Sequence, residues 1–142
     1  MTPPSLALPA RVQACRDEIA AQLRAYRDLV GAASKASGMS LVRIDAALAA
    51  FEPAFFNNLL IALDARFADR PRHADGAQAE VRLLADSLLA HGGVLTPVDA
   101  SPLAEPTPLL RLDAGDRITL NADDFQALCE PFLDELLRAP AA

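Results

Sequence analysis

The sequence contains none of the short motifs that identify a reaction or a cofactor. It has no CxxC pair, no HExxH motif and no glycine-rich phosphate loop. Its two cysteines, Cys15 and Cys129, each lie within an apolar helical pattern, where a free thiol behaves as a small hydrophobic side chain. We therefore expect no disulfide, no metal site and no cofactor.

The chain also lacks an uninterrupted run of 18 apolar residues and an excess of basic charge. Its net charge of −6 opposes binding to nucleic acid or anionic lipid, because both need a basic surface. The first nine residues contain three prolines and no basic segment, so they do not resemble a secretory signal. These absences predict a cytoplasmic protein that binds neither nucleic acid nor a membrane.

What the sequence does have is helical periodicity, and 52% of its 142 residues are hydrophobic. The stretch from Phe51 to Arg70 is the most apolar, with two stripes at helical spacing, Phe55/Leu59/Ala62 and Phe56/Leu60/Leu63/Phe67. This pattern predicts a central core helix. We expect a mainly α (α+β) fold of four to five helices around it, in a single domain over residues 9–138 between flexible tails at 1–8 and 139–142.

Start and stop signals divide the other helices. The first helix is expected from about Pro9 to Ser37, with the chain reversing at Gly38–Ser40 into a second helix. Because proline disfavours helical geometry in the preceding residue, a break or kink is expected at Glu52–Pro53. A further helix is predicted from about Ala77 to His91, and Asn121 and Asp124 are expected to cap the last one.

A C-terminal β-hairpin is predicted at about residues 109–120. The segments 109–112 and 117–120 alternate between apolar and polar residues, and Gly115 lies in the four-residue loop that joins them. An isolated hairpin is marginally stable, so it needs a helix or a third strand, for which the segment 94–96 is the nearby candidate.

Polar residues gather at the end of the central helix and in the following loop, namely Asp64, Arg66, Asp69, Arg70, Arg72, His73 and Asp75. Asp64 and His73 are a possible base and orienting group, and Asp69, His73 and Asp75 are possible ligands for a divalent cation. The alternative is a solvated helix end with weak ion pairs, which we favour because one His with nearby Asp residues lacks the spacing of a zinc or EF-hand site.

Asn57 and Asn58 interrupt the apolar run of the central helix, where Asn is a poor helix former. One of them is expected to tether a loop by hydrogen bonds rather than to contact a ligand, since burial without a partner costs a few kcal/mol. If the alternative of a ligand site holds instead, the candidate ligand-binding residues are Asn57, Asp64, Arg70 and His73.

Several segments together resemble an uncharacterised family of small bacterial proteins. These are Glu52–Asn58, Glu80–Leu89 and Gly115–Ile118, which read EPAFFNN, EVRLLADSLL and GDRI. The resemblance covers about Phe51 to Leu137. It implies no activity, cofactor or catalytic residue.

Without a catalytic constellation, the sequence favours a non-enzymatic helical protein-interaction or oligomerisation module, either a homodimer or a module that binds another protein. The first helix is the expected interface, through Ile19, Leu23, Tyr26 and Val30, because its apolar seam approaches a heptad. The alternative is a small-ligand-binding protein or enzyme with a pocket beside the central helix near Asp64, Arg70 and His73.

Overall fold

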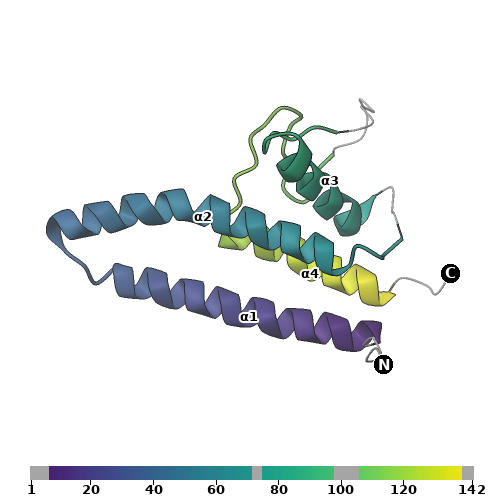
Figure 1. The fold of residues 1–142 in the computed structure, drawn as a ribbon, viewed down its shortest axis with the longest axis horizontal. Coiled ribbons are helices and arrows are strands. Elements are labelled where there is room, and N and C mark those ends of the chain that lie inside the picture. Colours follow the sequence, from purple (N-terminus) through teal and green to yellow (C-terminus); the bar gives the residue numbers. More distant parts are fainter. Residues whose placement is uncertain (1–6, 72–74, 98–105, 139–142) are drawn as a thin grey trace, which may run out of the picture. The chain divides into compact units, whose positions relative to one another are not determined.

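The computed structural model describes residues 7–71, 75–97 and 106–138, and most of these are helical. The described part contains four helices, α1 (Leu8–Ala33), α2 (Gly38–Arg66), α3 (Gly76–Ala90) and α4 (Ala122–Arg138) (Figure 1). The predicted mainly α fold is therefore confirmed. The chain divides into two compact units, residues 1–49 with 136–142 and residues 50–135. This division does not test the single domain predicted over 9–138.

The first unit contains an antiparallel hairpin made of α1 and the beginning of α2 (Figure 1). α1 ends at Ala33, where the Ser34 hydroxyl donates a 2.7 Å hydrogen bond to the carbonyl of Gly31. The chain therefore reverses over residues 34–37, slightly before the predicted position. Gly38 has a φ of +66°, as the turn requires, but it is the first residue of α2.

α2 runs without interruption through Pro53, so a break at Glu52–Pro53 is wrong, while the alternative of a kink there stays a prediction. A proline inside a helix costs about 3 kcal/mol because it removes a backbone hydrogen bond. The side chains of Phe56, Leu60 and Leu63 are almost fully buried directly after it. Since each such burial stabilises the fold by about 1.5–3 kcal/mol, packing outweighs the local penalty.

The core of the second unit forms around the end of α2, as the sequence predicts. The ring of Phe56 lies 6.0 Å from that of Phe125, and Phe67 makes an edge contact with Phe132 at 5.9 Å. These pairs occur in the same order on both helices, so α2 and α4 run in the same direction. The other predicted stripe, Phe55/Leu59/Ala62, is not a core stripe, because Phe55 and Leu59 are only half-buried and Ala62 is exposed.

Side chains cap the starts of α3 and α4 in this unit. Asn121 and Asp124 exchange side-chain to backbone hydrogen bonds of 2.8 and 3.3 Å at the start of α4, which confirms the predicted cap. At the start of α3, the carboxylate of Glu135 accepts hydrogen bonds from the backbone N–H groups of Ala77 and Gln78. Gly76 has a φ of +84°, and a Cβ there would overlap a carboxylate oxygen of Glu135. Only glycine therefore fits this cap.

The predicted β-hairpin at 109–120 is wrong. In the described residues the only β pairing is one antiparallel bridge between Val94 and Arg117. Its hydrogen bonds run from Leu95 N to Asp116 O and from Ile118 N to Gly93 O, both 2.8 Å long. The later half of the predicted hairpin thus pairs with residues 93–95, which overlap the predicted third strand at 94–96.

Side chains explain why residues 109–112 do not join this pairing. The Thr107 hydroxyl accepts a hydrogen bond from Leu112 N and donates one to Leu112 O. The buried carboxylate of Glu80 accepts the N–H groups of Leu109 and Leu110, at 2.9 and 3.0 Å. Arg111 has a φ of +58°, which breaks the extended backbone. The backbone groups that a hairpin would use are therefore already engaged.

Among the described residues, α2 is long and apolar enough by length and composition to cross a membrane. Only 17% of its most apolar 18-residue window is buried. A core helix of a soluble protein meets the same criteria, so this feature does not test the expectation that the protein has no membrane partner.

We expect Glu80→Gln to destabilise the fold by about 1–3 kcal/mol, because one N–H group of the 109–110 turn would lose its acceptor and face an amide donor. Urea unfolding followed by circular dichroism measures this change, and amide exchange at Leu109 and Leu110 locates it. Asp86→Asn, a matched change at an exposed position of the same helix, is the control. Equal stability of the two variants would contradict the proposed role of Glu80.

Candidate functional site

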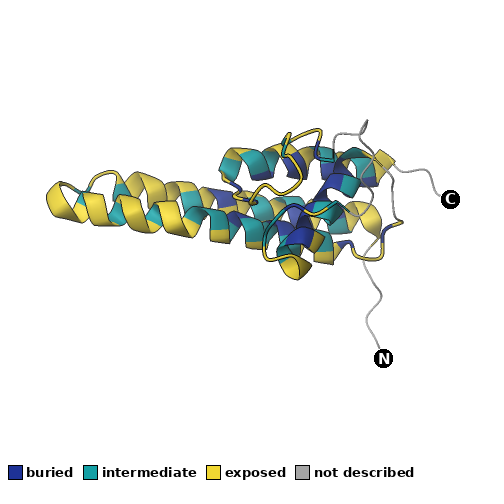
Figure 2. Cartoon of the chain, turned by 90° about the horizontal axis from the view of Figure 1, so that it is seen from above, coloured by how far each residue is buried: buried dark blue, intermediate teal, exposed yellow. Residues whose placement is uncertain are grey.

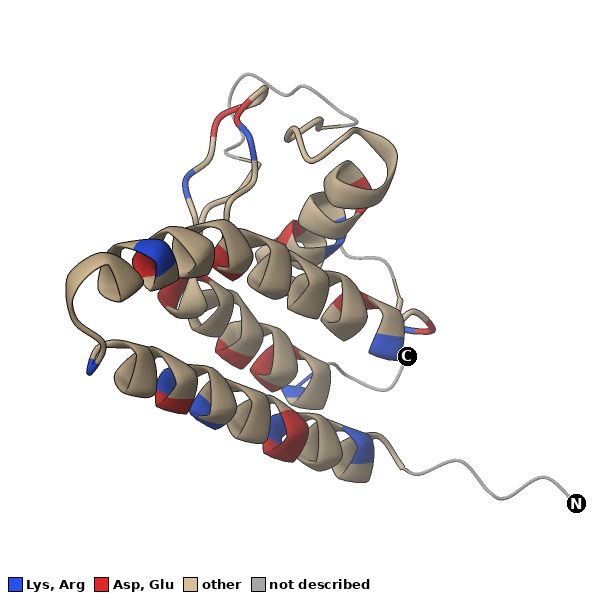
Figure 3. Ribbon diagram, turned by 60° about the vertical axis from the view of Figure 1, so that its left-hand side comes forward, with Lys and Arg blue, Asp and Glu red and all other residues tan. Residues whose placement is uncertain are grey.

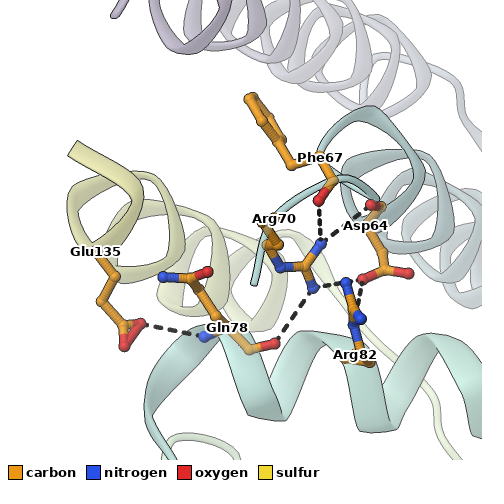
Figure 4. Close-up of polar contacts among 6 residues, drawn as sticks. All are labelled: Asp64, Phe67, Arg70, Gln78, Arg82 and Glu135. Atoms are coloured by element: carbon orange, nitrogen blue, oxygen red, sulfur yellow. Dashed lines mark hydrogen bonds and ion pairs between the residues drawn. The ribbon is translucent and has the colours of Figure 1, made fainter. Parts of the chain in front are cut away.

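Two of the predicted site residues, Asp64 and Arg70, lie together at the end of α2. An Arg70 Nη2–Asp64 Oδ1 contact of 2.5 Å joins them, and the Arg70 side chain is 3% exposed. Asp64 is also 3.8 Å from Nε of Arg82 on α3, so its carboxylate contacts two guanidinium groups (Figure 4). The sequence-derived cluster is thus in part an ion-pair network rather than a fully solvated helix end.

Arg70 also binds the backbone. Its Nη1 donates to the carbonyls of Phe67 and Asp64, at 2.9 and 3.2 Å, and its Nη2 donates to the carbonyl of Gln78 at 3.3 Å (Figure 4). Its guanidinium carbon lies 4.8 Å from the ring centre of Phe132. Carbonyls at a helix end lack partners within the helix, so Arg70 caps α2 and links it to α3 and α4.

Asn57 lies elsewhere and binds a different segment. Its side-chain amide donates to Ile118 O at 3.0 Å, and its carbonyl accepts from Leu120 N at 3.2 Å. A residue in a β-strand likewise offers one N–H donor and one C=O acceptor to the neighbouring strand, so the Asn57 side chain imitates a strand residue. Asn57 therefore extends the backbone pairing that Gly93 and Leu95 make with Ile118 and Asp116, and it tethers this loop. Asn58 is exposed.

The remaining candidates do not complete a reactive group in the described structure. His73 lies outside the described residues. No cluster of three or more His, Cys, Asp or Glu side chains in the described part is arranged to hold a metal ion. Both cysteines are buried, and they form no disulfide with each other. A buried oxygen of Gln78 has no partner, but one acceptor by itself does not make a site.

Sequence reasoning missed Glu80, Thr107 and Glu135, which hold backbone groups in the second unit. A signal existed for Glu80, which shares the apolar stripe of its helix with Ala77 and Leu84. A charged residue on a buried stripe needs a partner. Nothing in the sequence pointed to the backbone turn at 109–110 as that partner, because the partners are 29 and 30 residues away.

The predicted interface residues of α1 differ in exposure. Leu23 is 5% exposed, Ile19 and Tyr26 are half-buried, and Val30 is 37% exposed. Of the four, Val30 therefore has the most surface to offer to a partner.

Comparison with protein-family models, curated proteins and solved structures finds no match to this chain. The resemblance to a family of small bacterial proteins therefore stays an expectation, and the function has to be argued from the structure.

Arg70→Lys should destabilise the second unit by about 2–4 kcal/mol, because an ammonium group cannot reach the same set of acceptors and leaves buried carbonyls unpaired. Thermal and urea unfolding measure the loss. Arg66→Lys makes the same exchange at the exposed last residue of α2 and is expected to change stability by less than about 0.5 kcal/mol. A wild-type stability for Arg70→Lys would show that Arg70 is not the cap described above.

Asn57→Asp should cost about 1–3 kcal/mol, because it replaces the donor to Ile118 O by an oxygen that repels it. Asn58→Asp is the matched control one position along, since Asn58 is exposed. Amide exchange at Leu120 distinguishes a local effect from a global one: its protection is expected to fall before that of the α4 amides. Equal stability of both variants would argue against the tether.

Proposed function

We propose that this protein is a non-enzymatic helical interaction module that associates with a second copy of itself. The observation that supports this proposal is the poor burial of the α1–α2 hairpin. Only Val12, Cys15 and Leu23 are buried in the 26 residues of α1, and no residue from 38 to 49 is buried.

A pair of helices needs an apolar face on each to hold it together, and small structures with few buried side chains commonly depend on oligomerisation. In the hairpin, the apolar residues of α2 before Ala50 are half-buried or exposed, namely Met39, Leu41, Val42, Ile44 and Leu48. A second copy of the chain would cover them by the same hydrophobic effect that builds a core.

The polar residues give less support to the alternative, a small-ligand-binding protein or enzyme near Asp64, Arg70 and His73. Arg70 and Asn57 direct their hydrogen-bonding groups at the backbone of this chain. A ligand in the same place would have to displace those bonds. We therefore retain the interaction module, with a cytoplasmic location as its proposed setting.

We expect light scattering on a sizing column to give twice the monomer mass of 15.1 kDa at tens of micromolar protein, because two-fold dimers are the commonest closed assemblies. Dilution should return the monomer if the association is reversible. A mass of 15.1 kDa at every accessible concentration would overturn the proposal.

A further inference from the structure

The segment 115–121, which leads into α4, makes its backbone hydrogen bonds along one edge. That edge bonds to residues 93–95, and the side chain of Asn57 extends the same edge toward α4. In a bridged antiparallel pair, the backbone groups of successive residues point to opposite edges of the strand. The N–H and C=O groups of Arg117 and Thr119 therefore point away from residues 93–95.

These outward groups are open. Within the described ranges, neither Arg117 nor Thr119 has a hydrogen bond to its N–H or C=O group, and both residues are exposed. Figure 2 shows much of the irregular chain beside α3 in yellow, the colour of exposed residues. We refer to the N–H and C=O groups of these two residues as the open edge.

The geometry of the open edge specifies the kind of partner that fits it. It offers a donor and an acceptor at one residue and the same pair two residues further along an extended backbone. An extended chain lying alongside matches this spacing, as when a strand is added to the edge of a sheet. Native proteins normally cover or pair such edges.

The opposite side of the paired segments is already closed. Val94, which faces Arg117 across the bridge, donates its N–H to His91 O at 3.2 Å and accepts the Thr96 hydroxyl at 2.9 Å. The bridged pair therefore has one open edge.

This asymmetry favours a second copy of the chain as the occupant. A single peptide added to the open edge would present a new unpaired edge on its own far side. A second copy would not, because its far side is covered by its own residues 93–95 and Asn57. One open edge in each copy also limits the assembly to two, with the same surface used by both copies.

We infer that two copies of the chain pair antiparallel through their open edges, with Ile118 of one copy opposite Ile118 of the other. In this register, Arg117 of each copy lies opposite Thr119 of the other. Directly opposite residues in such a pair exchange both N–H and C=O bonds, so all open groups of both copies find partners. This inference rests on the proposed self-association and adds to it a contact surface in the second unit.

Charge and the existing hydrogen bonds select this register. Figure 3 shows residues of both signs on the irregular chain before α4, so the register decides which charges meet. Centring the pair on Arg117 would place two arginines directly opposite each other, which is destabilising. Centring it on Thr119 would place Arg117 opposite Asn121, whose N–H and C=O are already bonded to Asp124 and Phe125.

The first test uses charge at the paired positions and measures dimerisation by light scattering on a sizing column. Thr119→Lys places a like charge opposite Arg117 at two symmetric points, so we expect it to weaken the dimer by about tenfold. The double variant Arg117→Glu with Thr119→Lys should restore dimerisation, because opposite charges then meet. Ala114→Lys adds the same charge at an exposed position of the same loop, outside the paired residues, and should leave the dimer unchanged.

The second test measures amide hydrogen exchange in the wild type and does not depend on any variant. The N–H groups of Arg117 and Thr119 should be protected at concentrations where the dimer forms and lose that protection on dilution. Gly115 is the internal control, because its N–H donates to Leu95 O at 2.8 Å within one copy. Its protection should not depend on concentration. Circular dichroism of each variant checks that the fold is retained.

The outcomes separate this inference from the proposed function. A dimer in which the Arg117 and Thr119 amides exchange freely, and which Thr119→Lys does not weaken, would overturn the open-edge pairing and leave the self-association standing. A wild type that is monomeric at every concentration would overturn both. Protection of the two amides only in a complex with a different protein would assign the edge to a foreign strand and overturn the pairing of two copies.

Discussion

The second unit depends on satisfying the backbone of a segment that has almost no regular structure. Between α3 and α4 the described chain makes a single β-bridge, yet Leu95, Ile118 and Leu120 within it are buried. Buried N–H and C=O groups need partners, and here side chains from the helices provide many of them. The side chain of Asn57 forms hydrogen bonds with the backbone of residues 118 and 120. The side chain of Glu80 does so with residues 109 and 110, and that of Ser87 with residue 96. The helices thus replace neighbouring strands.

The same constraint accounts for the polar residues at the end of α2. Arg70 binds three backbone carbonyls and the carboxylate of Asp64, and each of these groups comes from a helix end or its neighbour. In the sequence these residues resemble a reactive cluster, because arginine and aspartate also occur as catalytic and ligand-binding residues. In this structure their geometry is that of a helix cap, and it links three helices of the unit.

The two units differ in how completely they bury their apolar residues. Phenylalanine pairs between α2 and α4 close the second unit around a set of fully buried side chains. The hairpin of the first unit leaves four large apolar side chains exposed, namely Leu29, Val30, Met39 and Val42. Burying a surface of this kind against a partner lowers the free energy. The proposed function is therefore binding of a protein partner rather than of a substrate.

The sequence by itself determined which parts of the chain are mainly helical, because their apolar residues recur at a spacing that depends only on local geometry. It also determined the last helix cap and the core stripe of Phe56, Leu60, Leu63 and Phe67. The tertiary structure decided the outcome wherever distant residues compete for the same groups. Alternation at 109–112 suggested a strand, but Glu80, about 30 residues earlier, binds its N–H groups; burial beyond Pro53 kept α2 continuous despite the local penalty. The same is true of the candidate site. The sequence identified Asn57 and Arg70 as unusual residues, but only the packing of the helices decided that both bind backbone groups of this chain and have a structural role.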